Sequence, residues 1–486
     1  MPDPTTPDPT TPDPTTPDPT TPDPTTPPSA PDAHAREPAA LTRKVVAGAS
    51  LLLLVVVGAV AITQLTGTDD APGMLTERPG VAAPTQDDAD PDAPGVDSDA
   101  APEPGASESP SLEPVVLVPR VDVVDQTVVA EGLDVPWGLA ELPDGDLLVT
   151  LRDRAQILRV SDASGGGGPV ALTGPGAEQL LTETVPQGEG GLLGIAVAPS
   201  GPDPDAGTDA NAGTDPATDT DTTTDPATAP DAVTVFVYRT GAEDNAVLRS
   251  TLTGNDLAPW EPVVTGIPRA GVHNGGALGI GPDGHLYVAT GDAGDTRLAQ
   301  DIESLGGKIL RVALDGTVPS GNPIPGSPLW SWGHRNVQGL DWDDRERMFA
   351  SEFGQNDIDE LNLIVAGQNY GWPRAEGPGG TQDGFVDPVA WWSPMDASLS
   401  GLAVTSEGIY LAGLRGERLW RVPLGAVVRP EAIEPQALLV AEHGRLRGLL
   451  ASDDGLLVAT CNTDGRGEPA ESDDRILRLT LAPAAG

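Results

Sequence analysis

Short runs of β-branched and aliphatic residues alternate with Gly-containing turns through most of the C-terminal part of the chain. The same turn and apolar run occurs four times, at residues 142–150, 281–290, 405–413 and 452–460. A second apolar run containing one arginine follows each copy, at residues 157–160, 309–312, 419–422 and 476–479. This order predicts β-hairpins, because glycine adopts the positive φ that tight turns require. We expect the arginine of each second strand to point outward.

Two weaker copies fill the gaps between these four. One is residues 192–200, which continues at 233–240 and 247–252; the other is 339–351, followed by 360–364. Six copies, each long enough for a four-stranded antiparallel sheet, predict an all-β fold, a six-bladed β-propeller over residues 113–484. Seven blades or a pair of sandwiches are the alternatives.

The N-terminal part has a different composition. Residues 1–42 consist mainly of a repeated Pro-Asp-Pro-Thr-Thr unit, which predicts a disordered tail. Residues 45–62 carry no charge and follow Arg43 and Lys44, which predicts a transmembrane anchor over 43–66. The basic pair would stay cytoplasmic, so we expect a single-pass protein of the cell membrane with an extracytoplasmic propeller. A cleaved signal peptide is the alternative.

Acidic residues dominate two further segments and the chain as a whole. Residues 67–112 predict a disordered linker, and residues 201–231 predict a disordered insertion within the propeller. The chain has 73 Asp and Glu against 27 Lys and Arg, a net charge of −46, which argues against a nucleic-acid partner. Its one cysteine excludes a disulfide framework and a cysteine-based metal cluster.

Polar, Gly-rich segments lie between the apolar strands and carry the candidate chemistry. Blade-connecting loops of a propeller surround a central channel, so these segments are expected to meet at one mouth. They include His273, which is either a general base or a loop histidine bonded to backbone. Four arginines would form either a cationic cluster for a polycarboxylate or separate surface ion pairs, namely Arg335, Arg415, Arg445 and Arg447.

An acidic cluster and an aromatic turn add weaker signals. Asp357, Asp359 and Glu360 suggest a site for a hard cation, since oxygen ligands suit calcium. Trp372, in the sequence NYGWP, would serve either packing or ligand stacking. No Walker loop, GxSxG or HExxH motif occurs, so nucleotide, serine-hydrolase and zinc-protease activities lack support.

Taken together, several segments resemble the soluble aldose sugar dehydrogenase family, also called the glucose/sorbosone dehydrogenase family. The matching strings run in unbroken order from residue 134 to about 480, and include GEGGLLGIA, HNGGALGIGPDGHLYVATGDAGD, LGGKILRV, GHRNVQGLDW, DELNLIVAGQNYGWP, LRGERLWRV and GRLRGLLASDDG. The resemblance implies a six-bladed propeller that uses pyrroloquinoline quinone (PQQ) and Ca2+. It further implies an aldose substrate oxidised at C1 to a lactone, and a respiratory or artificial electron acceptor.

The same resemblance implies a role for particular residues. His273 would be the general base, with Arg335 beside the quinone and the reacting hydroxyl. The cofactor site would comprise Glu189, Arg335, Asn336, Arg415, Arg445 and Arg447. The backbone carbonyls of Gly354 and Gln355 would bind calcium. Glu189, Val272 and Arg297 depart from the residues that glucose-oxidising relatives carry, so the resemblance does not extend to glucose specificity.

Two functions from other classes remain as alternatives. A propeller of this kind could be a non-catalytic binding module at the cell surface, since a fold does not determine a function. It could also be a calcium-dependent hydrolase of the lactonase type. A hydrolase would need side-chain carboxylate and Asn ligands converging on the metal, whereas His273 together with the four arginines favours the dehydrogenase.

Overall fold

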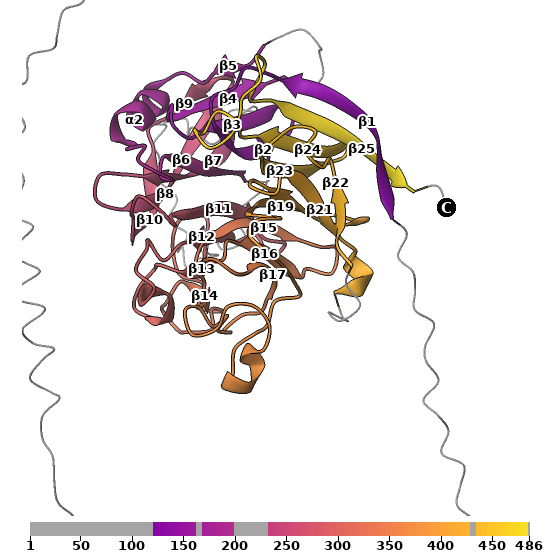
Figure 1. The fold of residues 1–486 in the computed structure, drawn as a ribbon. Coiled ribbons are helices and arrows are strands. Elements are labelled where there is room, and N and C mark those ends of the chain that lie inside the picture. The colour runs from indigo at the N-terminus through magenta and orange to yellow at the C-terminus, as the bar shows by residue number, and fades with distance from the viewer. Residues whose placement is uncertain (1–119, 162–167, 199–231, 428–433, 485–486) are drawn as a thin grey trace, which may run out of the picture. The chain divides into compact units, whose positions relative to one another are not determined.

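The computed structural model describes residues 120–161, 168–198, 232–427 and 434–484. These residues form six antiparallel sheets (Figure 1), of which five have four strands and one has five. The predicted tail, membrane anchor, linker and acidic insertion, residues 1–42, 43–66, 67–112 and 201–231, lie outside the described residues. Within the described part of the chain, no helix is long and apolar enough to cross a membrane.

Each of the first three sheets is a run of strands consecutive in the chain. The first contains β2 (Pro136–Glu141), β3 (Leu147–Leu151), β4 (Gln156–Val160) and β5 (Val170–Ala171). The second contains β6 (Leu192–Val197), β7 (Ala232–Thr240), β8 (Asn245–Thr253), β9 (Asp256–Leu257) and β10 (Glu261–Ile267). The third contains β11 (Gly275–Ile280), β12 (Leu286–Thr290), β13 (Lys308–Val312) and β14 (Leu329–Trp332).

The fourth and fifth sheets repeat this order, and the sixth joins the two ends of the domain. The fourth contains β15 (Val337–Trp342), β16 (Met348–Glu352), β17 (Asp359–Ile364) and β18 (Ala390–Trp392). The fifth contains β19 (Leu399–Thr405), β20 (Gly408–Gly413), β21 (Arg418–Val422) and β22 (Gln436–Leu438). The sixth contains β23 (Leu446–Ser452), β24 (Gly455–Thr460), β25 (Ile476–Pro483) and β1 (Val121–Ala130).

The described helices are short and lie between strands. They are α2 (Pro175–Glu183), and the 3-10 helices η2 (Leu298–Gln300), η3 (Gly380–Asp383) and η4 (Leu424–Ala426).

The first strand of each sheet lies innermost, and these six strands form a closed ring. Contacts run from β2 to β6, β11, β15, β19 and β23, and from β23 back to β2. The prediction of a six-bladed β-propeller is therefore confirmed. The acidic insertion separates β6 from β7, yet the two strands pair, as the sequence predicted.

Apolar side chains fill the six interfaces between neighbouring sheets. In β3, Leu147 and Val149 pack toward the sixth sheet, whereas Leu148 between them packs toward the second. Successive side chains of a strand point to opposite faces, so a sheet buried on both faces needs a continuous apolar run. This requirement explains why the repeated segments read as unbroken runs of Leu, Val and Ala.

The ring closes where β1 pairs with β25, which brings residues 121–130 beside residues 476–483. Gln436 of β22 supports this pairing from the neighbouring sheet. Its Nε2 donates to the Val121 carbonyl at 2.5 Å, and its Oε1 accepts from the Val121 N–H at 3.1 Å. A buried side chain of the fifth sheet therefore holds the first residue of β1.

The expectation that the strand arginines point outward is wrong for Arg311 and Arg421, which are 8% and 2% exposed. Arg421 donates through Nε and Nη2 to the Glu407 carbonyl, at 3.0 and 2.5 Å. Arg311 donates to Asp283 and Asn322 at 2.8 and 2.9 Å. These partners lie in turns and neighbouring segments, so they satisfy the guanidinium groups without water.

Replacing Gln436 by alanine should destabilise the closure of the ring. Two hydrogen bonds to Val121 disappear, and we expect the free energy of unfolding to fall by about 1–3 kcal/mol. Chemical denaturation measures this loss, and hydrogen exchange should increase along β1. Gln126→Ala is the matched control, because within the described residues the Gln126 side chain bonds only to the side chains of Glu442 and His443 at the surface. Equal stability of both variants would contradict the role given to Gln436.

Candidate active site

The predicted site residues lie at one end of the propeller, the end at which the six inner strands begin, which we call the site end. Glu189 precedes β6, His273 precedes β11, and Arg335 precedes β15. The other predicted residues occupy equivalent places: Asn336 before β15, Arg445 before β23, Arg447 as its second residue, Gly354 and Gln355 after β16, and Arg415 after β20. The repeated strand order therefore gathers segments that are far apart in the sequence.

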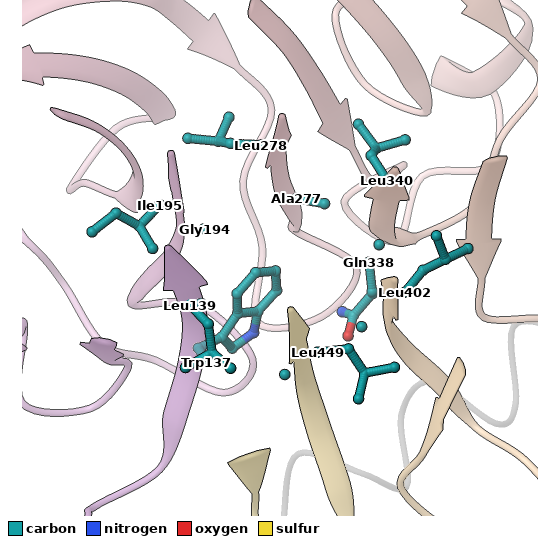
Figure 2. A pocket seen from close by; sticks show the side chains of 14 residues that line it. Trp137, Leu139, Gly194, Ile195, Ala277, Leu278, Gln338, Leu340, Leu402 and Leu449 are labelled. Carbon is teal, nitrogen blue, oxygen red and sulfur yellow. The ribbon is translucent and has the colours of Figure 1, made fainter. Parts of the chain in front are cut away.

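A narrow cavity of about 70 Å³ lies between the inner strands. Figure 2 shows the Trp137 indole and the Gln338 amide among the Leu and Ile side chains that line it. Arg447 contacts both residues: its Nη1 donates to Gln338 Oε1 at 3.0 Å, and its guanidinium carbon lies 5.9 Å from the centre of a Trp137 ring. Nη1 also lies 3.2 Å from Ser400 Oγ.

Two carboxylates hold His273. Its Nδ1 lies 2.7 Å from Asp292 Oδ1, and its backbone N–H donates to Glu189 Oε2 at 3.0 Å. Its φ of 54° lies in the left-handed region, which favours glycine, so the surrounding contacts must maintain it. The histidine side chain keeps 18% of its surface exposed, whereas the Asp292 side chain is fully buried.

Asp292 determines which nitrogen of the neutral His273 imidazole carries the proton. It accepts from Trp372 Nε1 at 2.9 Å and from the Gly294 N–H at 2.8 Å, in addition to His273. Burial alone would raise the pKa of this carboxyl. The hydrogen bond and charge of His273, with the Trp372 and Gly294 donors, outweigh burial and hold the pKa below its ordinary value. An ionised carboxylate only accepts, so Nδ1 carries the proton and Nε2 of the neutral ring keeps its lone pair.

Arg335 and Asn336 stand beside this pair. The Arg335 guanidinium carbon lies 5.5 Å from the centre of a Trp372 ring, and its Nη1 donates to the Phe353 carbonyl at 3.0 Å. Asn336 is fully buried, and its Oδ1 accepts from the Gly275 N–H at 2.9 Å. Three buried nitrogen atoms of the site have no hydrogen-bond partner among the described residues: Arg335 Nε, Asn336 Nδ2 and Arg447 Nε.

Polar contacts also link Arg445 to Glu189. Arg445 Nη2 donates to Asp464 Oδ2 at 2.8 Å, while Asp464 Oδ1 accepts from the Arg466 N–H at 2.9 Å. Arg466 Nη2 lies 3.3 Å from Glu189 Oε1. Burial would raise the pKa of the Asp464 carboxyl, but the hydrogen bond and charge of Arg445 hold it below its ordinary value.

Arg415 and the predicted calcium segment lie outside this chain of contacts. Arg415 is exposed and forms no ion pair within the described part of the protein. The Gly354 N–H donates to Asp359 Oδ1 at 3.0 Å, and the Gln355 N–H donates to Glu376 Oε1 at 2.6 Å. A Cβ at Gly354 would lie 1.6 Å from the Ile358 carbonyl oxygen, so only glycine fits there.

The prediction of a cation site formed by the side chains of Asp357, Asp359 and Glu360 is wrong. Over the described ranges, no three acidic, histidine or cysteine side chains come together as a metal site. Asp359 and Glu360 are adjacent in β17, so their side chains point to opposite faces of the sheet. Asp359 instead accepts the backbone N–H groups of Gly354, Ser398 and Leu399.

Three residues with defined places in the site were not predicted: Asp292, Asp464 and Arg466. Asp292 stands in the segment GDAGD, where a polar residue just after a strand was the available signal, and Trp372, expected to serve packing or stacking, donates to it. Asp464 and Arg466 lie in an acidic loop whose composition matches the rest of the surface. Nothing local distinguishes them.

Comparison with known proteins identifies the family. The family model described as glucose/sorbosone dehydrogenase matches residues 220–476, more than half of the sequence, and the chain belongs to this family of oxidoreductases. The PQQ-bound form of aldose sugar dehydrogenase from Streptomyces coelicolor is 48% identical, with a TM-score of 0.62, over 75% of this chain and 98% of that one. The prediction of a dehydrogenase of this family is confirmed.

Two further bacterial proteins are similar in sequence. Aldose sugar dehydrogenase of Escherichia coli is 29% identical over 58% of this chain and 73% of its own length. Quinoprotein glucose dehydrogenase B of Acinetobacter calcoaceticus is 29% identical over 52% of this chain and 53% of its own length.

The lowered pKa of Asp292 predicts a pH-dependent contribution to stability. A depressed pKa in the folded state stabilises the fold above the ordinary pKa of the group, and this contribution is lost as pH falls through the folded-state value. Asp292→Asn places an amide where three donors, His273 Nδ1, Trp372 Nε1 and the Gly294 N–H, need acceptors. We expect about 1–3 kcal/mol less unfolding free energy at pH 7, with a difference that shrinks below about pH 4.

Urea denaturation at several pH values measures this difference. Glu261→Gln, on the exposed outer strand β10, is the control and should stay close to the wild type throughout. A deficit in Asp292→Asn that is equally large at pH 3 and pH 7 would show that the charge of Asp292 is not the cause.

Proposed function

We propose that this protein is a quinoprotein dehydrogenase that oxidises aldose sugars at C1 to lactones, with PQQ as its cofactor. One observation carries the proposal: buried donors without partners lie at the same end of the propeller as a histidine oriented by a buried aspartate. The 48% identity to an enzyme whose structure holds PQQ supports the choice of cofactor.

The charges and free donors of the site fit a tricarboxylate such as PQQ. Arg335 Nε, Arg447 Nε and Asn336 Nδ2 are buried without partners, which is costly unless a ligand accepts from them. Arg415 adds a guanidinium that no carboxylate of the described chain neutralises. Arginine binds carboxylates through paired, charge-assisted hydrogen bonds. We therefore assign Arg415, Arg445 and Arg447 to the carboxylates of PQQ, and Arg335 with Asn336 to a place beside the quinone.

The proposal also includes calcium, held by the backbone carbonyls of Gly354 and Gln355. Asp359 and Glu376 fix the N–H groups of these two residues, so the segment that carries the carbonyls is held in place. The absence of a Cβ at Gly354 lets the backbone pass close to Ile358. When bound, PQQ supplies a quinone that accepts hydride from the sugar, and calcium polarises its oxygens.

The protein's own residues provide the proton chemistry. His273 Nε2 takes the proton of the C1 hydroxyl, because Asp292 holds the other ring nitrogen protonated. Positive charge that develops on the imidazole is balanced by the Asp292 carboxylate, as in the aspartate–histidine pairs of other enzymes. Arg335, stacked on Trp372, presents a cation beside the developing alkoxide.

Reconstitution tests the proposed function. Purified protein is mixed with PQQ and Ca2+, and reduction of an artificial acceptor dye is followed with a panel of aldoses. We expect dye reduction with at least one aldose, formation of the lactone, and PQQ absorbance that remains with the protein after gel filtration. No dye reduction with any sugar together with no retained PQQ would refute the proposal.

His273→Ala separates catalysis from cofactor binding. Loss of the base should lower kcat by at least about 100-fold, whereas PQQ affinity should stay within about three-fold, because the arginines remain. His285→Asn is the control, since His285 follows the turn between β11 and β12 at the other end of the same sheet. If His273→Ala loses PQQ as well, or keeps full turnover, the assignment of His273 as base is wrong.

A further inference from the structure

We infer that Arg466 is a positioning residue of the active site, which holds Glu189 against the backbone of the catalytic histidine and compensates its charge. The inference rests on the proposed function, because it assigns Arg466 a role in the same reaction. Arg466 belongs to the loop between β24 and β25, far in sequence from both Glu189 and His273.

The two oxygen atoms of Glu189 have different partners. Oε2 accepts the backbone N–H of His273 at 3.0 Å, and Oε1 lies 3.3 Å from both Nη1 and Nη2 of Arg466. The carboxylate therefore bridges the loop of the last sheet and the segment that precedes β11. His273 keeps a left-handed φ of 54°, so the hydrogen bond to its N–H helps to hold an unfavourable conformation.

The loop that carries Arg466 is itself fixed to the predicted cofactor site. Asp464 accepts the Arg466 N–H through one oxygen and Arg445 Nη2 through the other. The Asp464 side chain is 1% exposed, whereas the Arg466 side chain is 56% exposed. The buried aspartate thus places the backbone of Arg466, and the guanidinium reaches from there to Glu189.

Two anionic residues contact His273 directly: Glu189, before β6, accepts from its backbone N–H, and Asp292, after β12, bonds to its imidazole. Each has a cationic residue one contact further away: Arg466, after β24, bonds to Glu189, and Arg335, before β15, stacks on Trp372, which donates to Asp292. Removing the Arg466 charge leaves Glu189 uncompensated, and an uncompensated anion favours the protonated imidazole.

Neutralising Arg466 should therefore shift the proton titration of the base. For Arg466→Gln, we expect the acidic limb of the kcat/KM profile to move up by about 0.5 pH unit, a modest shift because the guanidinium is partly exposed. This corresponds to about a three-fold loss of kcat/KM on that limb. Arg466→Lys keeps the charge and should restore the wild-type limb. PQQ affinity should stay unchanged, since Arg445 keeps its bond to Asp464.

A measurement without cofactor separates this inference from the proposed function. NMR titration of the apoprotein follows the imidazole Cε1–H signal of His273, assigned by its absence in His273→Asn. The same upward shift should appear in Arg466→Gln and be absent in Arg466→Lys. Arg249→Gln is the control, because Arg249 forms a similar exposed ion pair with Glu261 on outer strands of the second sheet.

Two results would overturn the inference while leaving the dehydrogenase assignment intact. One is an Arg466→Gln protein that binds PQQ normally and titrates like the wild type. The other is an equal shift in Arg466→Gln and Arg466→Lys, which would exclude a role of the charge. A double-mutant cycle tests whether Arg466 acts through Glu189: with Glu189→Gln present, Arg466→Gln should lower kcat/KM on the acidic limb less than it does alone, and additive losses would contradict action through Glu189.

Discussion

The pairing of β1 with β25 is the interaction on which the rest of the structure depends. It completes the sixth sheet with a strand from the start of the domain, so the first and sixth sheets can pack on each other and close the ring. Only in a closed ring do all six inner strands begin around one channel. The site end exists because of this closure, and no single sheet contains more than part of the site.

Closure of the ring also brings the charged residues of the site together. The chain carries a net charge of −46, yet several arginines gather where the inner strands begin. Arg445 and Arg466 are paired with Asp464 and Glu189, whereas Arg335 and Arg447 keep buried donors without partners in the described chain. Arg466 holds its loop, Arg445 combines its bond to Asp464 with a place in the proposed cofactor site, and Arg335 and Arg447 have donors available to an anionic ligand. The site is therefore locally cationic, although the net charge of the whole chain is strongly negative.

The strands and their sixfold repetition could be predicted from the sequence, but individual contacts between residues far apart in the chain could not. Gly-containing turns and continuous apolar runs reveal strands buried on both faces, and motif order reveals the site loops. The partner of β1 has no local signal, because residues 121–130 meet residues 476–483 only after folding. The burial of Arg421 also has no local signal, because it depends on the Glu407 carbonyl that accepts from its guanidinium. Arg466 looks like any surface arginine until Glu189 is placed beside it.

A crystal structure of the protein grown with PQQ and Ca2+ tests the central claim most directly. The account predicts one PQQ at the site end, with its carboxylates within hydrogen-bond distance of Arg415, Arg445 and Arg447. It also predicts density for calcium at the carbonyls of Gly354 and Gln355, and His273 Nε2 directed toward the quinone. PQQ bound elsewhere, or at the site end with its carboxylates turned away from these arginines, would contradict the account.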